Sequence, residues 1–327
     1  MTRPRLASVV LVLTVTTWAG VAAPAPSIWR RAAAPSTHAA AEMRQRAGDQ
    51  LDEHVRLGQR AASRSQPQAT VAALDGAAQA LDGAENHRDP MLRHQMGRVH
   101  HYRYQLVSDA RELELAIEHF QYVVRHPRTP TTLRASALQT MAVSYARLGR
   151  HRDEIEVYDE ALTLEPDPDS HAVLLANQAE GLMARGRILQ AVRGYRAALR
   201  VTSTVLMLES GVTTLWGLAV ALDRSGDLEG ALASIASARR YDPLDQRLNG
   251  PGWFFVPAYD EAYYAALGHW QRARAARDMA DRDESYGAAI ASWRSFLDRA
   301  PRDDPWAPIA QRRLADCQRE QRERRAR

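Results

Sequence analysis

From about residue 90 onward, hydrophobic residues recur three and four positions apart, the spacing that places them on one face of an α-helix. Runs typical of strands are almost absent. The breaks between helical stretches carry helix-start pairs at Asp89-Pro90, Thr129-Pro130 and Asp304-Pro305, and helix-ending glycines at Gly149, Gly186 and Gly226. The pattern predicts an all-α protein made of helical pairs.

One spacing occurs three times. The first copy reads Leu138-x2-Met141-Ala142-x2-Tyr145, then Glu154-x3-Tyr158-x2-Ala161 and Pro166. The second and third copies read Leu175-x2-Gln178-Ala179-x2-Leu182 with Ala191-x3-Tyr195-x2-Ala198, and Leu215-x2-Leu218-Ala219-x2-Leu222 with Ala231-x3-Ile235-x2-Ala238 and Pro243. Small residues at Ala142, Ala179 and Ala219 would let paired helices approach closely. Glu154, Gln178 and Ser203 depart from the pattern without removing it.

This spacing resembles that of the tetratricopeptide repeat (TPR) family. The resemblance implies a right-handed α-solenoid with a concave groove, because one repeat cannot bury its own apolar face and must stack on the next. The predicted solenoid covers 89–310, with its best repeats at 135–168, 172–205 and 212–245 and degenerate repeats at about 90–127 and 260–301. In the last of these we expect an insertion between the two helices. An Ala-rich helical pair is expected at 39–86, and a capping helix with an Arg-rich tail at 305–327.

The first residues resemble an export signal. Arg3 and Arg5 precede an uncharged stretch from Leu6 to Trp18, and small residues follow, which favours cleavage after Ala22. This predicts a signal peptide at 1–22 and an Ala/Pro-rich linker at 23–38. The alternative is an uncleaved anchor, because 6–25 has about the length of a membrane-spanning helix. The expected location is periplasmic or extracellular, with attachment to the inner membrane if the anchor is retained.

Charge and cysteine content narrow the possible partners. All 43 basic residues are Arg, and 39 acidic residues leave a net charge of only +4, which is too balanced to indicate a nucleic-acid partner. A single cysteine, Cys317, excludes an intramolecular disulfide and gives no thiol for lipid attachment near the amino terminus. We expect Cys317 to be a small apolar residue of the last helix.

The TPR resemblance places partner-binding residues on the first helix of each pair, on the face opposite the core contacts. The candidates are Gln139, Arg147, Glu180, Met183, Trp216, Asp223 and Arg224. Trp216 with Arg224 could hold an aromatic or acidic peptide element, since guanidinium groups pair with carboxylates and stack on rings. The alternative is that Trp216 packs on the next repeat. The family's chaperone-binding clamp needs lysines, which this chain lacks.

A segment at 248–259 interrupts the helical pattern and is rich in aromatic residues. It fits either an aromatic plug between repeats or a weaker second partner-binding site, since exposed apolar patches mark interfaces. The residues of this aromatic loop that would bind a partner are Trp253, Phe254, Phe255 and Tyr259.

Six histidines lie between residues 87 and 126, namely His87, His94, His100, His101, His119 and His126. Pairs seven residues apart lie about 10 Å apart along a helix, too far to share one metal ion without a second helix. We expect no metal, no cofactor and no enzymatic activity, because no catalytic or nucleotide-binding motif is present. The acidic run Glu165 to Asp169 reads as a cap and a turn.

These observations predict a non-catalytic protein-protein interaction scaffold of the bacterial cell envelope that binds a peptide or helix of a partner in its groove. The partner itself is not identified by the sequence. Membrane contact is expected only through an uncleaved amino-terminal segment. One alternative is a structural assembly subunit that uses the aromatic loop and the solenoid ends. A less favoured alternative is a metal-binding or enzymatic protein that uses the histidines at 87–126.

Overall fold

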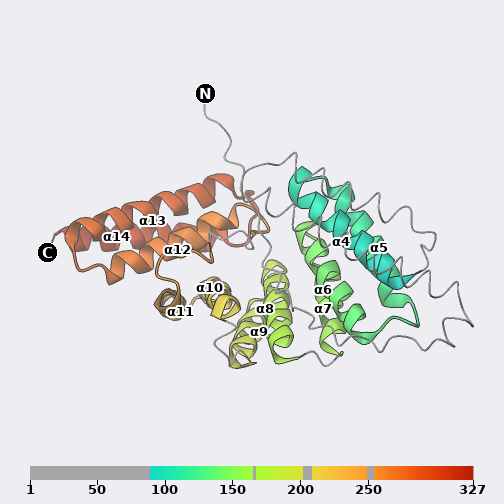
Figure 1. Ribbon diagram of the computed structural model, residues 1–327. Coiled ribbons are helices and arrows are strands. Elements are labelled where there is room, and N and C mark those ends of the chain that lie inside the picture. Colours follow the sequence, from blue (N-terminus) through green and yellow to red (C-terminus); the bar gives the residue numbers. More distant parts are fainter. Residues whose placement is uncertain (1–88, 165–166, 202–207, 249–253, 327) are drawn as a thin grey trace, which may run out of the picture. The chain divides into compact units, whose positions relative to one another are not determined.

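The computed structural model describes residues 89–164, 167–201, 208–248 and 254–326, with no account of the side chains of Leu106, Leu208 and Glu209. Within these ranges the chain forms eleven α-helices and no strand, so the predicted all-α class is confirmed (Figure 1). The predicted signal peptide, linker and helical pair at 39–86 lie outside the described residues, as do Pro166, Ser203 and Trp253. The chain divides into two compact units, Met1–Leu148 (unit 1) and Gly149–Arg327 (unit 2).

The described part of unit 1 contains three helices, α4 (Pro90–Val107), α5 (Ala110–Arg125) and α6 (Thr131–Arg147). Helix α5 packs against both of the others. Its fully buried Phe120 lies so close to Gly97 that a Cβ at that glycine would come within 2.7 Å of the ring. The absence of a side chain at Gly97 therefore allows α4 and α5 to approach closely.

Helix starts in unit 1 follow the sequence signals in part. Asp89 caps α4 as predicted, and its carboxylate accepts from the backbone N–H of Met91 at 2.8 Å. Thr129 was expected to cap the next helix, and this prediction was wrong. The hydroxyl of Thr129 instead donates to the carbonyl of Val123 at 2.7 Å, which holds the connection against the end of α5.

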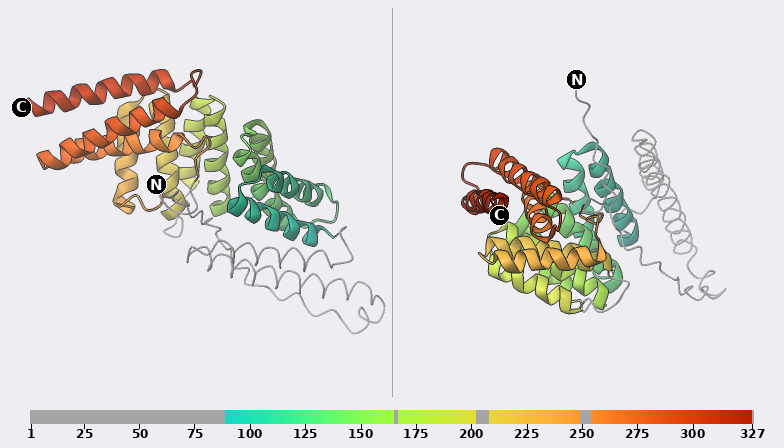
Figure 2. Two further views of the ribbon diagram at one scale, coloured as in Figure 1. Left: turned by 90° about the horizontal axis from the view of Figure 1, so that it is seen from above. Right: turned by 90° about the vertical axis from the view of Figure 1, so that its left-hand side faces the viewer.

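Unit 2 begins with α7 (His151–Leu162), α8 (Pro168–Ala184), α9 (Ile188–Val201), α10 (Leu208–Arg224) and α11 (Leu228–Tyr241). It continues with α12 (Asp260–Ala275), α13 (Met279–Arg299) and α14 (Ala307–Arg325). Each helix packs against the next, and α8, α10 and α12 also contact one another in succession (Figures 1 and 2). This stacking of helical pairs is a TPR-like repeat fold, in which α8, α10 and α12 are the inner helices.

Small residues set the distance between the helices of unit 2. Ala179 and Ala219 are fully buried, as the repeat pattern predicted. At Gly217 a Cβ would come within 2.6 Å of the Tyr195 ring. Glu154, which replaces the usual small residue, is accommodated in the same way, because a Cβ at Gly181 would lie 2.9 Å from its carboxyl group. A glycine on α8 thus makes room for the larger side chain on α7.

The predicted helix-ending glycines and the predicted cap at Asp167 are present in the described part of the chain. Gly149, Gly186 and Gly226 all have positive φ angles, as expected for residues that end a helix. Asp167 caps α8 ahead of Pro168, as predicted for the acidic run.

The carboxyl-terminal pair differs from the sequence prediction. An insertion was expected between its helices, but only residues 276–278 separate α12 from α13. The extra length is helical, since α13 has 21 residues, and the irregular segment lies before α12. The buried Cys317 lies in α14, as predicted. Within the described residues, no helix is both long enough and apolar enough to span a bilayer.

Candidate functional site

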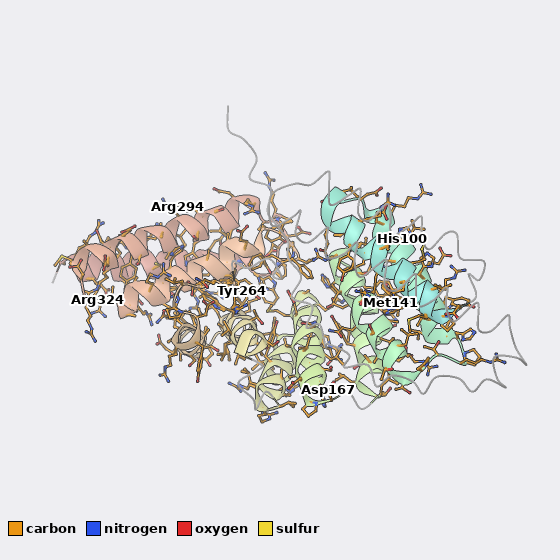
Figure 3. All side chains as sticks on the ribbon, viewed as in Figure 1. His100, Met141, Asp167, Tyr264, Arg294 and Arg324 are labelled. Atoms are coloured by element: carbon orange, nitrogen blue, oxygen red, sulfur yellow. The ribbon has the colours of Figure 1, made fainter. Side chains whose placement is uncertain are left out.

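A pocket of about 130 Å³ opens among the inner helices of unit 2. Its walls come from the ends of α8 and α10, the start of α12, the segment Phe255 to Tyr259 and the segment Asp304 to Trp306. We call it the inner pocket. Its lining residues are His151, Glu180, Met183, Ala184, Arg224, Phe255, Val256, Pro257, Tyr259, Asp260, Tyr264, Asp304, Pro305 and Trp306. Tyr264 on α12 is labelled in Figure 3.

The size of the inner pocket limits what it can hold. Small-molecule and cofactor sites usually measure about 300–1,000 Å³. The inner pocket is much smaller and is comparable to the roughly 150 Å³ cavity that accepts a benzene ring. It therefore matches a single side chain better than a whole cofactor.

Arg224 forms part of the wall and is almost completely buried. Its guanidinium group donates to Asp260 Oδ1 at 2.8 Å and lies over the rings of Tyr263 and Trp306, at 4.7 and 4.9 Å from their centroids. These contacts fix Arg224 between two aromatic rings and one carboxylate. Burial raises the pKa of Asp260, the Arg224 charge opposes that rise, and the Asp304 charge adds to it.

Asp304 is a second buried carboxylate of the inner pocket, with 8% of its surface exposed. One oxygen accepts from the Tyr259 hydroxyl at 2.7 Å and the other from the Trp306 backbone N–H at 2.8 Å. Both donors are neutral, and no cationic side chain of the described residues pairs with Asp304. Burial, followed by the hydrogen bond to Asp304, raises the pKa of the Tyr259 phenol, so this hydroxyl stays protonated and keeps donating.

The remaining charged groups of the inner pocket make it acidic. Glu180 brings a third carboxylate, while the only fixed cation among the lining residues is Arg224. His151 bonds through Nδ1 to Glu154 Oε2 at 2.8 Å, so even a protonated imidazole would be matched by its own carboxylate. Burial raises the pKa of Glu154, and its bond to His151 opposes that rise.

The predicted groove residues are not all on an open surface. Glu180, Met183 and Arg224 line the inner pocket. Gln139 and Arg147 belong to α6 in unit 1, are half-buried and are not part of the pocket. The structure differs from the expected open groove, because Trp216 and Asp223 are buried outside the pocket lining, and Met183 and Arg224, which line the pocket, are buried as well.

Contacts to later helices explain this burial. The Trp216 ring packs against Gly268 of α12, which is the packing alternative foreseen from the sequence. Asp223 accepts from the Tyr263 hydroxyl and from Arg313 of α14, both at 2.6 Å. The repeat spacing gives no signal of these contacts, since 90 residues separate Asp223 from Arg313.

Two residues of the aromatic loop also line the inner pocket. Phe255 and Tyr259 line the inner pocket beside Glu180 and Arg224, and Phe255 meets the ring of Tyr264 edge-on at 5.1 Å. Phe254 is half-buried outside the pocket lining, and Trp253 lies outside the described residues. The two sites predicted separately, groove and loop, therefore share one pocket in the described structure.

The histidines described in unit 1 have structural partners. His94 bonds to Ser136 and His101 to Ser144, each at 3.0 Å, so these two rings tie α4 to α6. Burial lowers the pKa of both to about 3, which keeps the rings neutral. His100 bonds to Glu112 and stacks on His119, and His126 stacks on Tyr122, while His87 lies outside the described residues.

Sequence reasoning did not select Asp260, Tyr264, Asp304 or Trp306 as site residues. Asp304 was interpreted only as a helix cap, and the helix in fact begins after Trp306. The one available signal was the position of Asp260 and Tyr264 at the start of an inner helix, directly after the aromatic loop.

No protein-family model and no curated protein sequence matches this chain. Among solved structures, it is similar to the apo form of RapI, with 11% identity, a TM-score of 0.49 and coverage of 84% of this chain and 99% of that one. It is also similar to the TPR domain of P58(IPK), with 16% identity, a TM-score of 0.35 and coverage of 85% and 67%.

Proposed function

We propose that this chain is a non-catalytic interaction scaffold that binds a peptide or helix of a partner protein across its inner helices. The observation that carries the proposal is the inner pocket. Residues from three successive inner helices, α8, α10 and α12, meet around a space that fits one side chain. An extended segment lying across these helices would be anchored there by one residue, as hot-spot residues anchor other interfaces.

The same proposal places the chain in the bacterial cell envelope. Arg3, Arg5 and the uncharged stretch that follows them support export. The inner pocket does not depend on this location, so the two parts of the proposal are tested separately. Fractionation of cells that express the full chain would show whether it leaves the cytoplasm.

The binding experiment uses an Ala184→Leu variant. Ala184 lines the inner pocket and is half-buried at the end of α8, so a larger side chain would fill the space while keeping a good helix former. Ala233→Leu, on an exposed face of α11, is the matched control. The full chain and both variants would be used to capture partners from the envelope fraction of the source cells.

We expect one partner to be retained by the original chain and by Ala233→Leu, and lost by Ala184→Leu. Equal capture by all three proteins would contradict binding at the inner pocket. If the captured partner is not a protein of the cell envelope, only the proposed location is contradicted.

A second candidate function, an assembly subunit, is favoured by one observation. Tyr241 and Leu244, at the end of α11, leave 62% and 73% of their surfaces exposed. Large apolar groups close together on a surface mark contact sites. Tyr241→Ser with Leu244→Ser should then change the oligomeric state or abolish assembly, whereas the scaffold proposal expects no change in capture.

A further inference from the structure

The charges of the inner pocket point to the chemistry of the residue that fills it. We propose that the inner pocket accepts a cationic side chain, the guanidinium or ammonium group of an arginine or lysine on the partner, with Asp304 as its counter-charge. The inference rests on the proposed function for the identity of the partner, but not for the binding of the cation itself.

Asp304 is held by neutral donors, and no cation among the described residues pairs with it. A carboxylate taken out of water is costly unless a cation or several donors compensate it. Asp260 has Arg224 at 2.8 Å, whereas Asp304 has only the Tyr259 hydroxyl and a backbone N–H. A cation entering the pocket would supply what the described residues do not.

The lining of the inner pocket as a whole carries more negative than positive charge. Even without Glu180, Asp260 and Asp304 contribute two carboxylates against the single guanidinium of Arg224, with His151 paired to Glu154. An acidic ligand would meet like charges here, which is a means by which proteins exclude wrong partners. The acidic peptide element expected from Trp216 and Arg224 alone is therefore disfavoured.

Aromatic residues form much of the remaining wall of the inner pocket. Phe255, Tyr259, Tyr264 and Trp306 surround the carboxylates with aromatic rings. Rings attract cations through their faces and also cover the hydrocarbon part of an arginine or lysine side chain. Arg224 already shows this arrangement, since its guanidinium lies over Trp306 at 4.9 Å from the ring centroid. Carboxylates, rings and a volume for one side chain together define a site for a single cationic residue.

The test uses blocked pentapeptides with one central residue, acetyl-Ala-Ala-X-Ala-Ala-amide, added to the full chain. X is arginine, lysine, norleucine or glutamate, so norleucine keeps the hydrocarbon chain of lysine without its charge. Binding is followed by NMR through the indole N–H signals of the tryptophans, of which Trp306 lines the pocket. Affinities in the millimolar range are sufficient for this measurement.

The variant is Asp304→Asn, which keeps the shape of the side chain and an oxygen that can accept from the Trp306 backbone N–H, while removing the charge. Asp303→Asn is the matched control, because it removes the same charge from the neighbouring exposed position. If Asp304→Asn fails to fold, as judged by circular dichroism, Glu180→Gln replaces it.

We expect the arginine and lysine peptides to bind at least tenfold more tightly than the norleucine and glutamate peptides. Asp304→Asn should reduce arginine binding about tenfold or more, and Glu180→Gln should also reduce it, because a hydrogen bond to a charged group is lost. Asp303→Asn should leave it unchanged. Equal binding of norleucine, tighter binding of glutamate, no binding of any peptide, or unchanged arginine binding by the charge-removing variant would each overturn the inference.

Failure of this inference is distinguishable from failure of the proposed function. The peptide experiment needs no natural partner, and the capture experiment needs no cationic residue. Loss of capture in Ala184→Leu without a preference for cationic peptides would refute only the inference. A cationic preference without any captured partner would refute only the scaffold proposal.

Discussion

Arg224 and Asp260 form a buried ion pair between α10 and α12, with Nη2 of Arg224 donating to Oδ1 of Asp260 at 2.8 Å. The pair joins two successive inner helices at the wall of the inner pocket. Arg224, which was predicted to lie on an open groove, is therefore part of the packing between repeats.

Removing Arg224 should therefore be strongly destabilising. Arg224→Met leaves Asp260 buried without its cation, and we expect a loss of about 3–5 kcal/mol in the free energy of unfolding, measured by urea denaturation. Arg152→Met is the control, because Arg152 and Glu156 form an exposed pair that should contribute about 0–1 kcal/mol. The double variant Arg224→Met/Asp260→Leu should recover most of the loss. Equal effects of Arg224→Met and Arg152→Met would contradict this account.

Close helix packing at Gly217 gives a second prediction. A Cβ at this position would come within 2.6 Å of the Tyr195 ring, so Gly217→Ala should destabilise the protein by about 1–3 kcal/mol in thermal or urea denaturation. Gly287→Ala is the opposite case, since nothing lies within 4 Å of its Cβ position in α13. That substitution should stabilise the protein by about 0.5–1 kcal/mol through helix propensity. Two effects of the same sign would show that the packing at Gly217 is not as described.

The buried histidines of unit 1 predict a loss of stability in acid. His94 and His101 have a pKa of about 3 in the folded chain and an ordinary value of 6.5 when unfolded. Between these values the unfolded chain binds more protons, so their contribution is complete above pH 6.5 and falls as the pH decreases toward 3. At pH 5, each of the two histidines should lower the free energy of unfolding by about 2 kcal/mol relative to its value above pH 6.5.

This prediction is tested by urea denaturation at pH 5 and pH 7.5. His101→Gln should reduce the pH dependence of unit 1 by about half, because one of the two titrating groups is removed. His126→Gln, at a half-buried histidine that stacks on Tyr122 outside the contact of α4 with α6, is the comparison variant. If the difference in the free energy of unfolding between pH 5 and pH 7.5 is unchanged in His101→Gln, this ring is not held neutral by burial.

The end of α14 is held by Glu320, whose carboxylate accepts from Trp270 Nε1 at 2.9 Å, from the Tyr286 hydroxyl at 3.1 Å and from Arg274 at 2.5 Å. Glu320→Ala removes the carboxylate that accepts from all three donors, and we expect the end of α14 to detach from α12 and α13 more often. Cys317 reports the opening, because it is buried in α14 and burial raises its thiol pKa to about 12.

We expect maleimide to label native Cys317 slowly at pH 7.5 and to label it at least tenfold faster in Glu320→Ala. Glu323→Ala is the control, since Glu323 is exposed and its ion pair with Arg319 is long, at 4.0 Å. Rapid labelling of the unaltered chain would show that α14 is not packed as described.

Much of the fold could be predicted from local spacing. The buried Ala179 and Ala219 follow from the repeat pattern, and the positive φ angles of Gly149 and Gly226 follow from the need to end a helix. These features depend on residues close together in the chain. Glu180 and Met183 were placed on an inner helix by the same local pattern, and both lie in α8 at the inner pocket.

The site was harder to predict because it depends on contacts between distant residues. Asp304 lies 45 residues from Tyr259, and Arg313 lies 90 residues from Asp223. The long-range contacts of α12 and α14 bury Trp216 and Asp223, and no repeat pattern encodes them. His94 and His101, seven residues apart, are explained in the same way, by serines on the facing helix α6.

The most direct test of the central claim is site-specific photo-crosslinking in source cells. A benzophenone amino acid would replace Phe255, which lines the inner pocket, or Tyr241, which lies exposed at the end of α11. The account predicts a covalent adduct with a partner protein from position 255 that disappears when Ala184→Leu is added, and none of that partner from position 241. An adduct formed from position 241 and absent from position 255 would contradict binding at the inner pocket.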